Sequence, residues 1–499
     1  MNRERNNPAV TAGLQADRVP AADKAPQVIV AGAGPAGLVA AITLAGYGVR
    51  VLLVDKRPEI SGLSRALVIS TRSMEILRSW GLEDQVRAGA SDVEPCGWVT
   101  PTLASGEGTV IPLGHPSAAE AAKVSPSRPA WAPQDHLEPI LLARLRGSPV
   151  AEVRLGCELT ALEQDDHGVA AVLHDRSTGT THQARARYLI GADGAHSTVR
   201  DQLGITMEGP DALGEYHRVE FRAPLAAIAG NRRYGINVIT HPEVAGVLAP
   251  RGRDDRWGLS REWRPGQPAL TAQSPEQLAD LIAAAAGVAS LRPRIERVST
   301  FSFAAQIASR YRERRGFVLG DAAHRMTPRG GTGMNTAIHD AYDLAWKLAW
   351  VLTYRAEPSL LDTYQAERRP VGLHNVTRSA DPNGLSQTAD QALPWDLNGR
   401  LPHHWLRHRD RSISTLDLLG DGLTVITGAA EPGWDHVAAA LDTRVPVAVR
   451  AVDQPTADHI GIQPGGAILL RPDGQPLMNW RKPAGRLHSG ALADHLRRG

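Results

Sequence analysis

Three glycines and a later carboxylate, spaced as a phosphate-binding turn requires, are the first residues of this chain that could do chemistry. They lie in residues 28–55, VIVAGAGPAGLVAAITLAGYGVRVLLVD, where Gly32, Gly34 and Gly37 form the pattern G-x-G-x-x-G. Gly32 allows a tight turn, Gly34 lets the backbone approach a pyrophosphate, and Gly37 lets a helix pack closely on a strand. Asp55 stands 18 residues after Gly37, where a carboxylate can accept hydrogen bonds from ribose hydroxyls. The pattern predicts a dinucleotide site without deciding between NAD and FAD.

A strand, a helix and a second strand must position these residues. Residues 28–31 are predicted to be a buried strand, and residues 35–45 a helix with proline near its first turn, where a missing N–H costs little. Residues 49–54 are predicted to be the second strand. The helix N-terminus offers free N–H groups and the positive end of its dipole to phosphates. The stretch is long enough to cross a bilayer, for which about 20 apolar residues suffice. Its five glycines and its final acid favour the folded unit instead.

The bulk composition is that of a soluble globular protein with more than one domain. The chain has 499 residues, of which 42% are hydrophobic and 22% charged, and a net charge of +2. The densest basic cluster, at 310–315, is interrupted by Glu313 and is expected to be a solvated turn, so no nucleic-acid partner is expected. Apart from residues 28–55, no segment approaches the length of a membrane span, and no membrane partner is expected.

Two cysteines, Cys96 and Cys157, are too few for a disulfide framework or a cysteine-built metal site. We therefore expect no metal, and a cytoplasmic location. Residues 1–26 lack the apolar region of a secretory signal, and their composition predicts a disordered tail.

Two later stretches also place an acid beside a glycine at the end of a strand-like run. Residues 186–200, ARYLIGADGAHSTVR, contain Asp193, and residues 314–352, RRGFVLGDAAHRMTPRGGTGMNTAIHDAYDLAWKLAWVL, contain Asp321. In the second stretch a glycine-rich loop leads into a helix beginning near Met334, whose apolar positions fall on one face.

These stretches resemble the class A flavoprotein monooxygenases, the p-hydroxybenzoate hydroxylase-like family of FAD-dependent aromatic hydroxylases. That family carries the amino-terminal glycine motif, a central D-G and a later G-D in this order. Further motifs match at SRALVISTRSMEILRSWGL (64–82), with Ser64 in place of a proline, at PQDHLEPILLARL (133–145) and at TYQAERRPVG (363–372). The resemblance covers residues 27–380.

The resemblance implies an α/β fold with several domains. A Rossmann-like FAD-binding domain would take residues 27–200 and 301–378, and an inserted antiparallel-sheet substrate domain residues 201–300 with parts of 90–130. Alternating runs at 234–240, 245–252 and 256–263 agree with such a sheet, and a helix is expected at 275–286.

The end of the chain is expected to be a separate unit. Residues 379–394 are expected to be a linker, and residues 395–499 resemble the thioredoxin-like carboxy-terminal domain of the larger phenol and polyketide hydroxylases. No cysteine lies in that domain, which excludes dithiol chemistry and leaves a structural or docking role.

The resemblance also implies which residues contact FAD. They are Gly32, Gly34, Ala36, Gly37, Asp55, Lys56, Arg65, Gln134, Asp321, Gly333, Met334 and Asn335. Asp321 would bind ribityl hydroxyls, Arg65 the pyrophosphate, and Gln134 the flavin or its ribityl chain. Met334 and Asn335 would touch the isoalloxazine ring, where the helix N-terminus would stabilise negative charge on the N1–C2=O side of a reduced flavin. Asp193, which the family ties to the nicotinamide cofactor as well as to FAD, is expected to contribute less.

The substrate side is less well defined by the sequence. The Pro328 carbonyl would edge the substrate cavity, and Arg329 would face either an acidic or carbonyl-bearing substrate or the solvent. Asp343 stands where many members of the family have asparagine. Polar candidates for engaging a phenol are Tyr216, His217, Tyr234, His241 and Arg261. About half of the side chains in an alternating strand face solvent, so the catalytic base stays unnamed.

The reaction implied by the resemblance is hydroxylation of a phenolic or quinone-related, polyketide-type compound, as in antibiotic biosynthesis. NADPH or NADH would reduce FAD, and the reduced flavin would capture O₂ as a C4a-hydroperoxide that delivers oxygen to the ring. The chain has no second complete glycine fingerprint, so the nicotinamide is expected to bind transiently.

Other readings stay open beside hydroxylation. The same scaffold could perform Baeyer–Villiger insertion or inactivate an antibiotic, or the chain could be a flavin-binding accessory protein without turnover. A simple NAD dehydrogenase would leave Asp321 and its loop without a purpose. The expected partner is a small aromatic substrate, and the chain could be a monomer or a homodimer.

Overall fold

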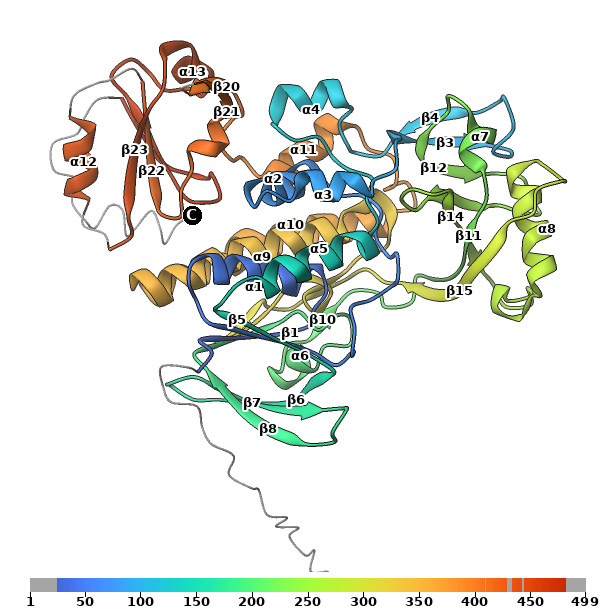
Figure 1. The fold of residues 1–499 in the computed structure, drawn as a ribbon, viewed down its shortest axis with the longest axis horizontal. Helices are drawn as coiled ribbons and strands as arrows, with labels where there is room; N and C mark the ends of the chain where they lie inside the picture. Colours follow the sequence, from blue (N-terminus) through green and yellow to red (C-terminus); the bar gives the residue numbers. More distant parts are fainter. Residues whose placement is uncertain (1–24, 409, 429–432, 442–443, 482–499) are drawn as a thin grey trace, which may run out of the picture.

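The computed structural model describes residues 25–408, 410–428, 433–441 and 444–481, so nearly all of the tail predicted at 1–26 lies outside the described residues. Figure 1 shows a central helix-covered sheet, a second sheet on one side of it and a smaller α/β unit on the other. The α/β class predicted from the sequence is confirmed.

A six-stranded sheet forms the centre of the molecule, in the order β17–β18–β9–β1–β2–β5. Every neighbouring pair in it is parallel except β17–β18. The strands β1 and β2 are buried along their whole length, as expected for parallel strands covered on both faces. The predicted strand at 28–31 is confirmed, and the second begins at Val51, two residues later than predicted. The bounds are β1 Val28–Ala31, β2 Val51–Asp55, β5 Ala151–Leu155, β9 Tyr188–Gly191, β17 Arg312–Glu313 and β18 Gly316–Val318.

Helices cover one face of this sheet, and a small antiparallel sheet covers the other (Figure 1). The helix layer contains α1 (Pro35–Gly46), α5 (Gln134–Arg146), α9 (Gly333–Ala349) and α10 (Asp362–Ala380), with α1 packed between α5 and α9. The opposite layer is β6 (Cys157–Gln164), β7 (Val169–Asp175) and β8 (Thr181–Ala186). Among the described helices, none combines the length and the apolar character that a bilayer span would need.

The second large sheet has seven strands in the order β15–β11–β14–β13–β12–β3–β4. One face packs on the predicted helix, α8 (Pro275–Ala286), around Val219, Phe221 and Leu259. Residues alternate between faces along a strand, so Arg218 points the other way, and its Nη1 donates to the Ser64 carbonyl oxygen at 3.1 Å. The bounds are β3 Glu94–Thr100, β4 Thr109–Pro112, β11 Gly214–Arg222, β12 Tyr234–Ile239, β13 Gly246–Pro250, β14 Arg256–Trp263 and β15 Arg294–Phe303.

The chain makes five of these seven strands, β11 to β15, as an insertion: it leaves the central sheet after β9 and returns at β17. The other two strands, β3 and β4, come from the earlier connection between β2 and β5. A short sheet of β10 (Met207–Glu208), β16 (Gln306–Ala308) and β19 (His324–Arg325) lies where the two connections pass. The seven-stranded sheet thereby lies beside the segment that follows β2, where Arg218 and Arg251 both donate to the Ser64 carbonyl oxygen.

The carboxy-terminal unit is a four-stranded sheet, β23–β22–β24–β25, with α12 (Trp434–Ala440) and α13 (Gln454–His459). Only the β22–β23 pair is parallel. Before this unit, α10 ends at Ala380 and a further helix, α11 (Ala389–Leu397), lies largely within the segment predicted as a linker. The bounds are β22 Leu423–Thr427, β23 Val447–Ala451, β24 Ala467–Leu470 and β25 Pro476–Trp480.

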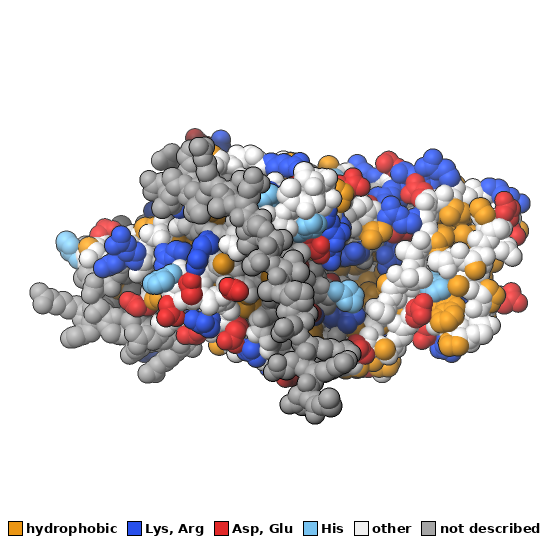
Figure 2. Space-filling view, turned by 90° about the horizontal axis from the view of Figure 1, so that it is seen from below, with side chains coloured by type: hydrophobic (Ala, Val, Ile, Leu, Met, Phe, Trp, Pro, Cys, Tyr) orange, Lys and Arg blue, Asp and Glu red, His pale blue; other side chains and the backbone are white. Residues whose placement is uncertain are grey.

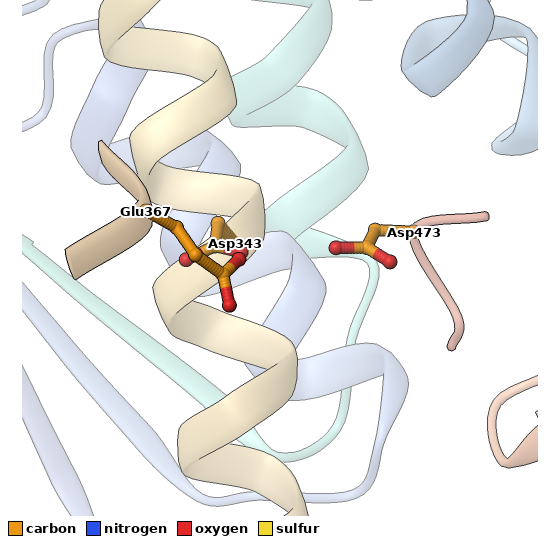
Figure 3. Close-up of side chains that lie close together, drawn as sticks. All are labelled: Asp343, Glu367 and Asp473. Atoms are coloured by element: carbon orange, nitrogen blue, oxygen red, sulfur yellow. The ribbon is translucent and has the colours of Figure 1, made fainter. Parts of the chain in front are cut away.

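A buried group of charges joins this unit to the helix layer. Figure 3 shows Asp473 of the carboxy-terminal unit pointing toward Asp343 of α9 and Glu367 of α10. Lys347 Nζ lies 2.8 Å from an Asp343 carboxylate oxygen and 3.1 Å from one of Glu367. Arg471 donates to both Glu367 oxygens at 2.7 and 2.8 Å. Two cations therefore compensate three acids that would otherwise have the spacing of metal ligands.

Candidate active site

The glycine turn between β1 and α1 has two glycines that the fold requires and one that leaves space for a ligand. Gly32 has φ +108°, and a Cβ there would lie 2.1 Å from the Ala192 carbonyl oxygen. A Cβ on Gly37 would lie 1.9 Å from the Gly32 carbonyl oxygen. A Cβ on Gly34 would meet no described atom within 4 Å. The turn is therefore closed on the sheet side and open at Gly34, which fits the approach of a pyrophosphate.

Asp55, the last residue of β2, is fixed beside this turn. One carboxylate oxygen accepts the Ala33 N–H at 2.7 Å, and the other accepts the Arg57 N–H at 2.8 Å. Burial raises the pKa of Asp55, but hydrogen bonds from Arg57 and Ala33 outweigh burial and hold it below its usual value. An ionised carboxylate in this place can still accept from a ribose. Its neighbour Lys56 is exposed.

The segment after β2 meets the start of α5 at Gln134, whereas the side chain of Arg65 in that segment is exposed. The Gln134 N–H donates to the Ala66 carbonyl oxygen at 2.9 Å, and its Nε2 donates to Glu138 Oε1 at 2.7 Å. Glu138 is 1% exposed, and its Oε2 has no hydrogen-bond partner among the described residues. Burial raises the pKa of Glu138 despite Gln134 and two nearby arginines, Arg57 and Arg65. The sequence motifs did not indicate that Glu138 and Arg57 lie here, although Glu138 follows Gln134 by one helical turn.

The glycine-rich loop at 328–333 ends at the N-terminus of α9, which begins at Gly333. The N–H groups of Gly333, Met334 and Asn335 have no acceptor among the described residues. They lie at the positive end of a 17-residue helix. Asp321, just past β18, is exposed, and its carboxylate has no hydrogen-bond partner in the described part of the chain. Free amides and a free carboxylate at this edge fit the carbonyl edge of a flavin and its ribityl hydroxyls.

The side chain of Asn335 does something that the sequence did not indicate. Its Oδ1 accepts the Ser70 N–H at 2.8 Å, and its Nδ2 donates to the carbonyl oxygens of Gly331 at 2.9 Å and Val68 at 3.2 Å. The amide joins the loop to residues 68–70 and leaves only the backbone of Asn335 for a ligand.

Asp193 is occupied within the protein. One oxygen accepts from the Ser197 hydroxyl and the other accepts the Val199 N–H at 3.0 Å, at the start of α6 (Thr198–Gln202). Burial raises the pKa of Asp193 in spite of these bonds. Its backbone lies beside Gly32 and so helps to close the turn, while its role toward a cofactor stays a prediction.

Of the polar residues proposed for the substrate side, the structure brings Tyr216 to the loop. Its ring stacks on Phe303 at 3.8 Å between centroids, and the Arg329 guanidinium lies 5.5 Å from the same ring. Burial raises the pKa of Tyr216, with Arg329 opposing, so the hydroxyl stays protonated. Arg329 also approaches the Ser379 carbonyl oxygen at 3.4 Å, so it is anchored and not free in solvent.

The other candidates lie apart from the loop. His217 accepts the Leu270 N–H on Nδ1 at 3.1 Å, on the face opposite Tyr216, and pairs across the strands with Arg261. Arg261 donates to backbone carbonyls near the start of β13. His241 is exposed after the end of β12, and Tyr234 stacks on Trp98 at 5.5 Å. The structure does not gather these four residues around one point.

An apolar wall faces the loop instead. Val68, Leu113 and Trp131 pack with residues that include Ile111 and Ile236 of the seven-stranded sheet. A Cβ on Gly331 would lie 2.6 Å from Val68. Figure 2 shows the surface hollowed between the central domain and the seven-stranded sheet, with hydrophobic, basic and histidine side chains around the hollow.

A small cavity of about 40 Å³ lies behind the same loop, between α9, α10 and α11. His115 and Arg378 line it, and burial, followed by Arg378, lowers the pKa of His115 to about 4. The cavity suits ordered water, because sites for drug-sized ligands span roughly 300–1,000 Å³.

Comparisons with known proteins agree with this architecture. The family model described as FAD binding domain matches residues 25–379, and that of the aromatic-ring hydroxylase C-terminal domain matches residues 397–499. The chain belongs to the FAD-dependent aromatic-ring hydroxylases. It is therefore an FAD-containing monooxygenase that uses NAD(P)H and O₂, and its carboxy-terminal unit is of the thioredoxin-like type.

Individual relatives cover almost the whole chain. Tetracenomycin B2 monooxygenase-dioxygenase from Streptomyces olivaceus is 35% identical over 94% of this chain and 97% of its own length. The flavin-dependent monooxygenase PieE, solved with FAD and substrate, has a TM-score of 0.85 at 28% identity, covering 96% of this chain and 99% of its own. Aklavinone-11 hydroxylase, solved with FAD and aklavinone, has a TM-score of 0.82 at 31% identity, covering 95% and 98%.

Proposed function

We propose that this enzyme hydroxylates a polycyclic, polyketide-type phenol or quinone. The observation that carries the proposal is the apolar wall of Val68, Trp131 and Ile236 beside the free amides of α9, which is suited to a flat apolar ring system. The structural similarity to PieE and aklavinone-11 hydroxylase, which extends over almost the whole chain, supports it, since both were solved with substrate.

The residues around the turn and the loop divide the binding of FAD among them in this proposal. The open backbone at Gly34 with the start of α1 takes the pyrophosphate together with Arg65, and Asp55 takes the adenosine ribose. Asp321 takes the ribityl hydroxyls, and the amides of Gly333 and Met334 hold the negative edge of the ring. Ala36, Gly37 and Gln134 shape the cleft, and Lys56 stays at its rim.

FAD when bound supplies the redox chemistry: it accepts a hydride from NAD(P)H and transfers one oxygen atom of O₂ to the ring, the other leaving as water. The protein orients the aromatic ring against the apolar wall and excludes water from it. Arg329, anchored beside Tyr216, is placed to donate to a carbonyl or phenolate oxygen of the substrate. The Pro328 carbonyl oxygen accepts the Gly331 N–H at 3.1 Å, so any contact with the substrate would use its remaining lone pair. A protonated Tyr216 serves as a hydrogen-bond donor and not as a base.

The domain division proposed from the sequence is kept: FAD binding at 27–200 and 301–378, the substrate domain at 201–300 with parts of 90–130, and the thioredoxin-like unit from 395. The family models, which meet between residues 379 and 397, support the last boundary. A small aromatic compound is the proposed partner. The cytoplasmic location stays a prediction from the sequence.

The test compares polycyclic phenols and quinones with single-ring phenols as stimulators of NADPH oxidation by the purified yellow protein. Products are identified by mass spectrometry after reaction under ¹⁸O₂. We expect one labelled oxygen per product molecule, and only with polycyclic compounds. Coupled turnover of single-ring phenols alone would replace the proposed substrate class. A ring-expanded lactone would instead identify a Baeyer–Villiger enzyme. If neither class of compound stimulated NADPH oxidation, the chain would be an accessory protein.

A further inference from the structure

Helix α2 (Thr71–Ser79) carries a buried carboxylate, Glu75, that bonds to an arginine of the carboxy-terminal part of the chain. Glu75 accepts from Arg400 Nε at 3.1 Å and from Arg400 Nη2, so the contact has two points. Both side chains are 3% exposed. Arg72 Nη1 and the Ser125 hydroxyl complete the shell of Glu75 at 2.9 and 2.7 Å. Arg400 lies inside the range of the aromatic-ring hydroxylase C-terminal model.

The first turn of α2 has two more contacts with residues late in the chain. The Arg72 N–H donates to an Asp396 oxygen at 3.1 Å, and Arg72 Nη2 donates to the Asp473 carbonyl oxygen at 2.6 Å. Together with Arg400 these contacts fix the start of α2 against the segment from α11 onward.

Helix α2 also contacts the glycine-rich loop at 328–333, which we call the flavin loop because FAD is proposed to bind at its end. Ser70 caps α2, and its N–H donates to Asn335 Oδ1 at 2.8 Å. Asn335 is 4% exposed, and its Nδ2 holds the Gly331 carbonyl oxygen at 2.9 Å. A continuous series of polar contacts therefore runs from Arg400 through Glu75, α2 and Ser70 to the loop.

We propose that the carboxy-terminal unit, which has no cysteine for redox chemistry, positions the flavin loop through the Glu75–Arg400 pair. Glu75 and Arg400 are positioning residues, because they act through Ser70 and Asn335 and do not face the proposed flavin position. The inference rests on the proposed placement of FAD at residues 330–335. Catalytic groups need to be held within about 0.5 Å of their working geometry, so a small shift of α2 matters.

The direct test replaces Glu75 with glutamine, which keeps the shape and removes the charge that two arginines share. We expect the Kd for FAD to rise roughly tenfold and a larger part of the NADPH consumed to yield hydrogen peroxide instead of hydroxylated product. The measurements are FAD fluorescence titration, and product and peroxide formed per NADPH. The matched control is Arg78→Gln. Arg78 lies on the same helix and pairs with Asp417 of the same unit, but at the surface and without contact to Ser70 or Asn335. It should stay within about twofold of the wild type in both measurements.

A second variant keeps the test informative if Glu75→Gln does not fold. Arg400→Lys preserves the charge and loses the two-point contact, and it should give a smaller change in the same direction. Asn335→Ala breaks the path at its other end, so adding Glu75→Gln or Arg400→Lys to it should increase the peroxide fraction no further.

Two results would overturn the inference: variants with a lower melting temperature but wild-type FAD affinity and peroxide fraction, or effects that simply add to those of Asn335→Ala. A wild-type protein that binds no FAD or forms no product would instead contradict the proposed function.

Discussion

Single carboxylates in this site differ in how much of their hydrogen-bonding capacity the protein itself uses. Asp55 and Asp193 are both bonded to backbone N–H groups, and Glu138 to Gln134. Asp321 alone among these four is exposed and has no hydrogen-bond partner in the described residues. Because the Asp321 side chain makes no hydrogen bond within the described protein, removing it should affect the fold little, and any change in its variant reports on ligand binding.

We therefore expect Asp321→Ala to abolish FAD retention while the protein stays folded. The absorbance near 450 nm per protein measures occupancy, and the melting temperature without added FAD measures stability. Asp280→Ala, on the exposed side of α8, is the control and should retain full occupancy. Full flavin occupancy in Asp321→Ala would remove Asp321 from the site.

At the scale of elements, α1 carries a glycine that packing requires and another that it does not. Gly37 has no room for a Cβ, because the Gly32 carbonyl oxygen would lie 1.9 Å away. Gly46, at the end of the same helix, has nothing within 4 Å of that position. Comparing alanine at these two positions therefore distinguishes the steric requirement of the turn at Gly37 from the general destabilisation that any glycine causes in a helix.

Gly37→Ala should push α1 away from β1, lower the melting temperature and weaken FAD binding, because the turn and the helix N-terminus move together. Gly46→Ala should be neutral or stabilise by about 0.5–1 kcal/mol, since alanine favours helix over glycine. Thermal unfolding with and without FAD checks both. Equal stabilities for the two variants would contradict the close approach of α1 and β1.

The whole molecule is joined by the buried charges between α9, α10 and the carboxy-terminal unit. Arg471 is 4% exposed and bridges Glu367 with Asp473. Burial raises the pKa of Asp343 to about 7, partly opposed by Lys347, while burial of Glu367 is outweighed by Lys347 and Arg471, which keep its pKa low. Of these two acids, Asp343 is therefore the one whose pKa is raised.

Replacing Arg471 with methionine leaves two acids without their bridge. We expect a loss of about 3–5 kcal/mol in the free energy of unfolding, the usual cost of breaking a buried pair on one side. Denaturant unfolding followed by tryptophan fluorescence measures it, with the exposed Arg450→Met of β23 as the control. A loss no larger than that of the control would show that the bridge contributes little to joining the two parts.

The raised pKa of Asp343 also has a pH signature. The folded state holds this proton more tightly than the unfolded state, so its contribution to stability is full below about pH 4 and is lost as pH rises through about 7. Asp343→Asn cannot titrate. Its melting temperature relative to the wild type should therefore improve from pH 5 to pH 8. A constant difference would contradict the shift.

The sequence predicts the glycine turn and α8 almost to the residue, because turn geometry and helix periodicity are local. It does not predict that the Asn335 side chain bonds to Ser70, since that contact joins segments far apart in the chain. The alternating pattern of β11 predicts that neighbouring residues face opposite ways. It does not predict which face packs on α8, and that packing is what turns His217, with Val219 and Phe221, away from the loop. Helix α11 could have been found from Thr388 and Gln391, which form a capping box.

The insertion of strands β11 to β15 between β9 and β17 has a consequence for how the chain folds during translation. As the chain leaves the ribosome, β1, β2 and β9 are complete while the strand that covers the outer edge of β9 is still unmade. All five inserted strands, β11 to β15, must be translated before β18 arrives, and until then β9 exposes an unpaired edge on which other chains can associate. Production of this enzyme should therefore depend on chaperones and on the rate of translation through residues 201–318 more strongly than its finished architecture suggests.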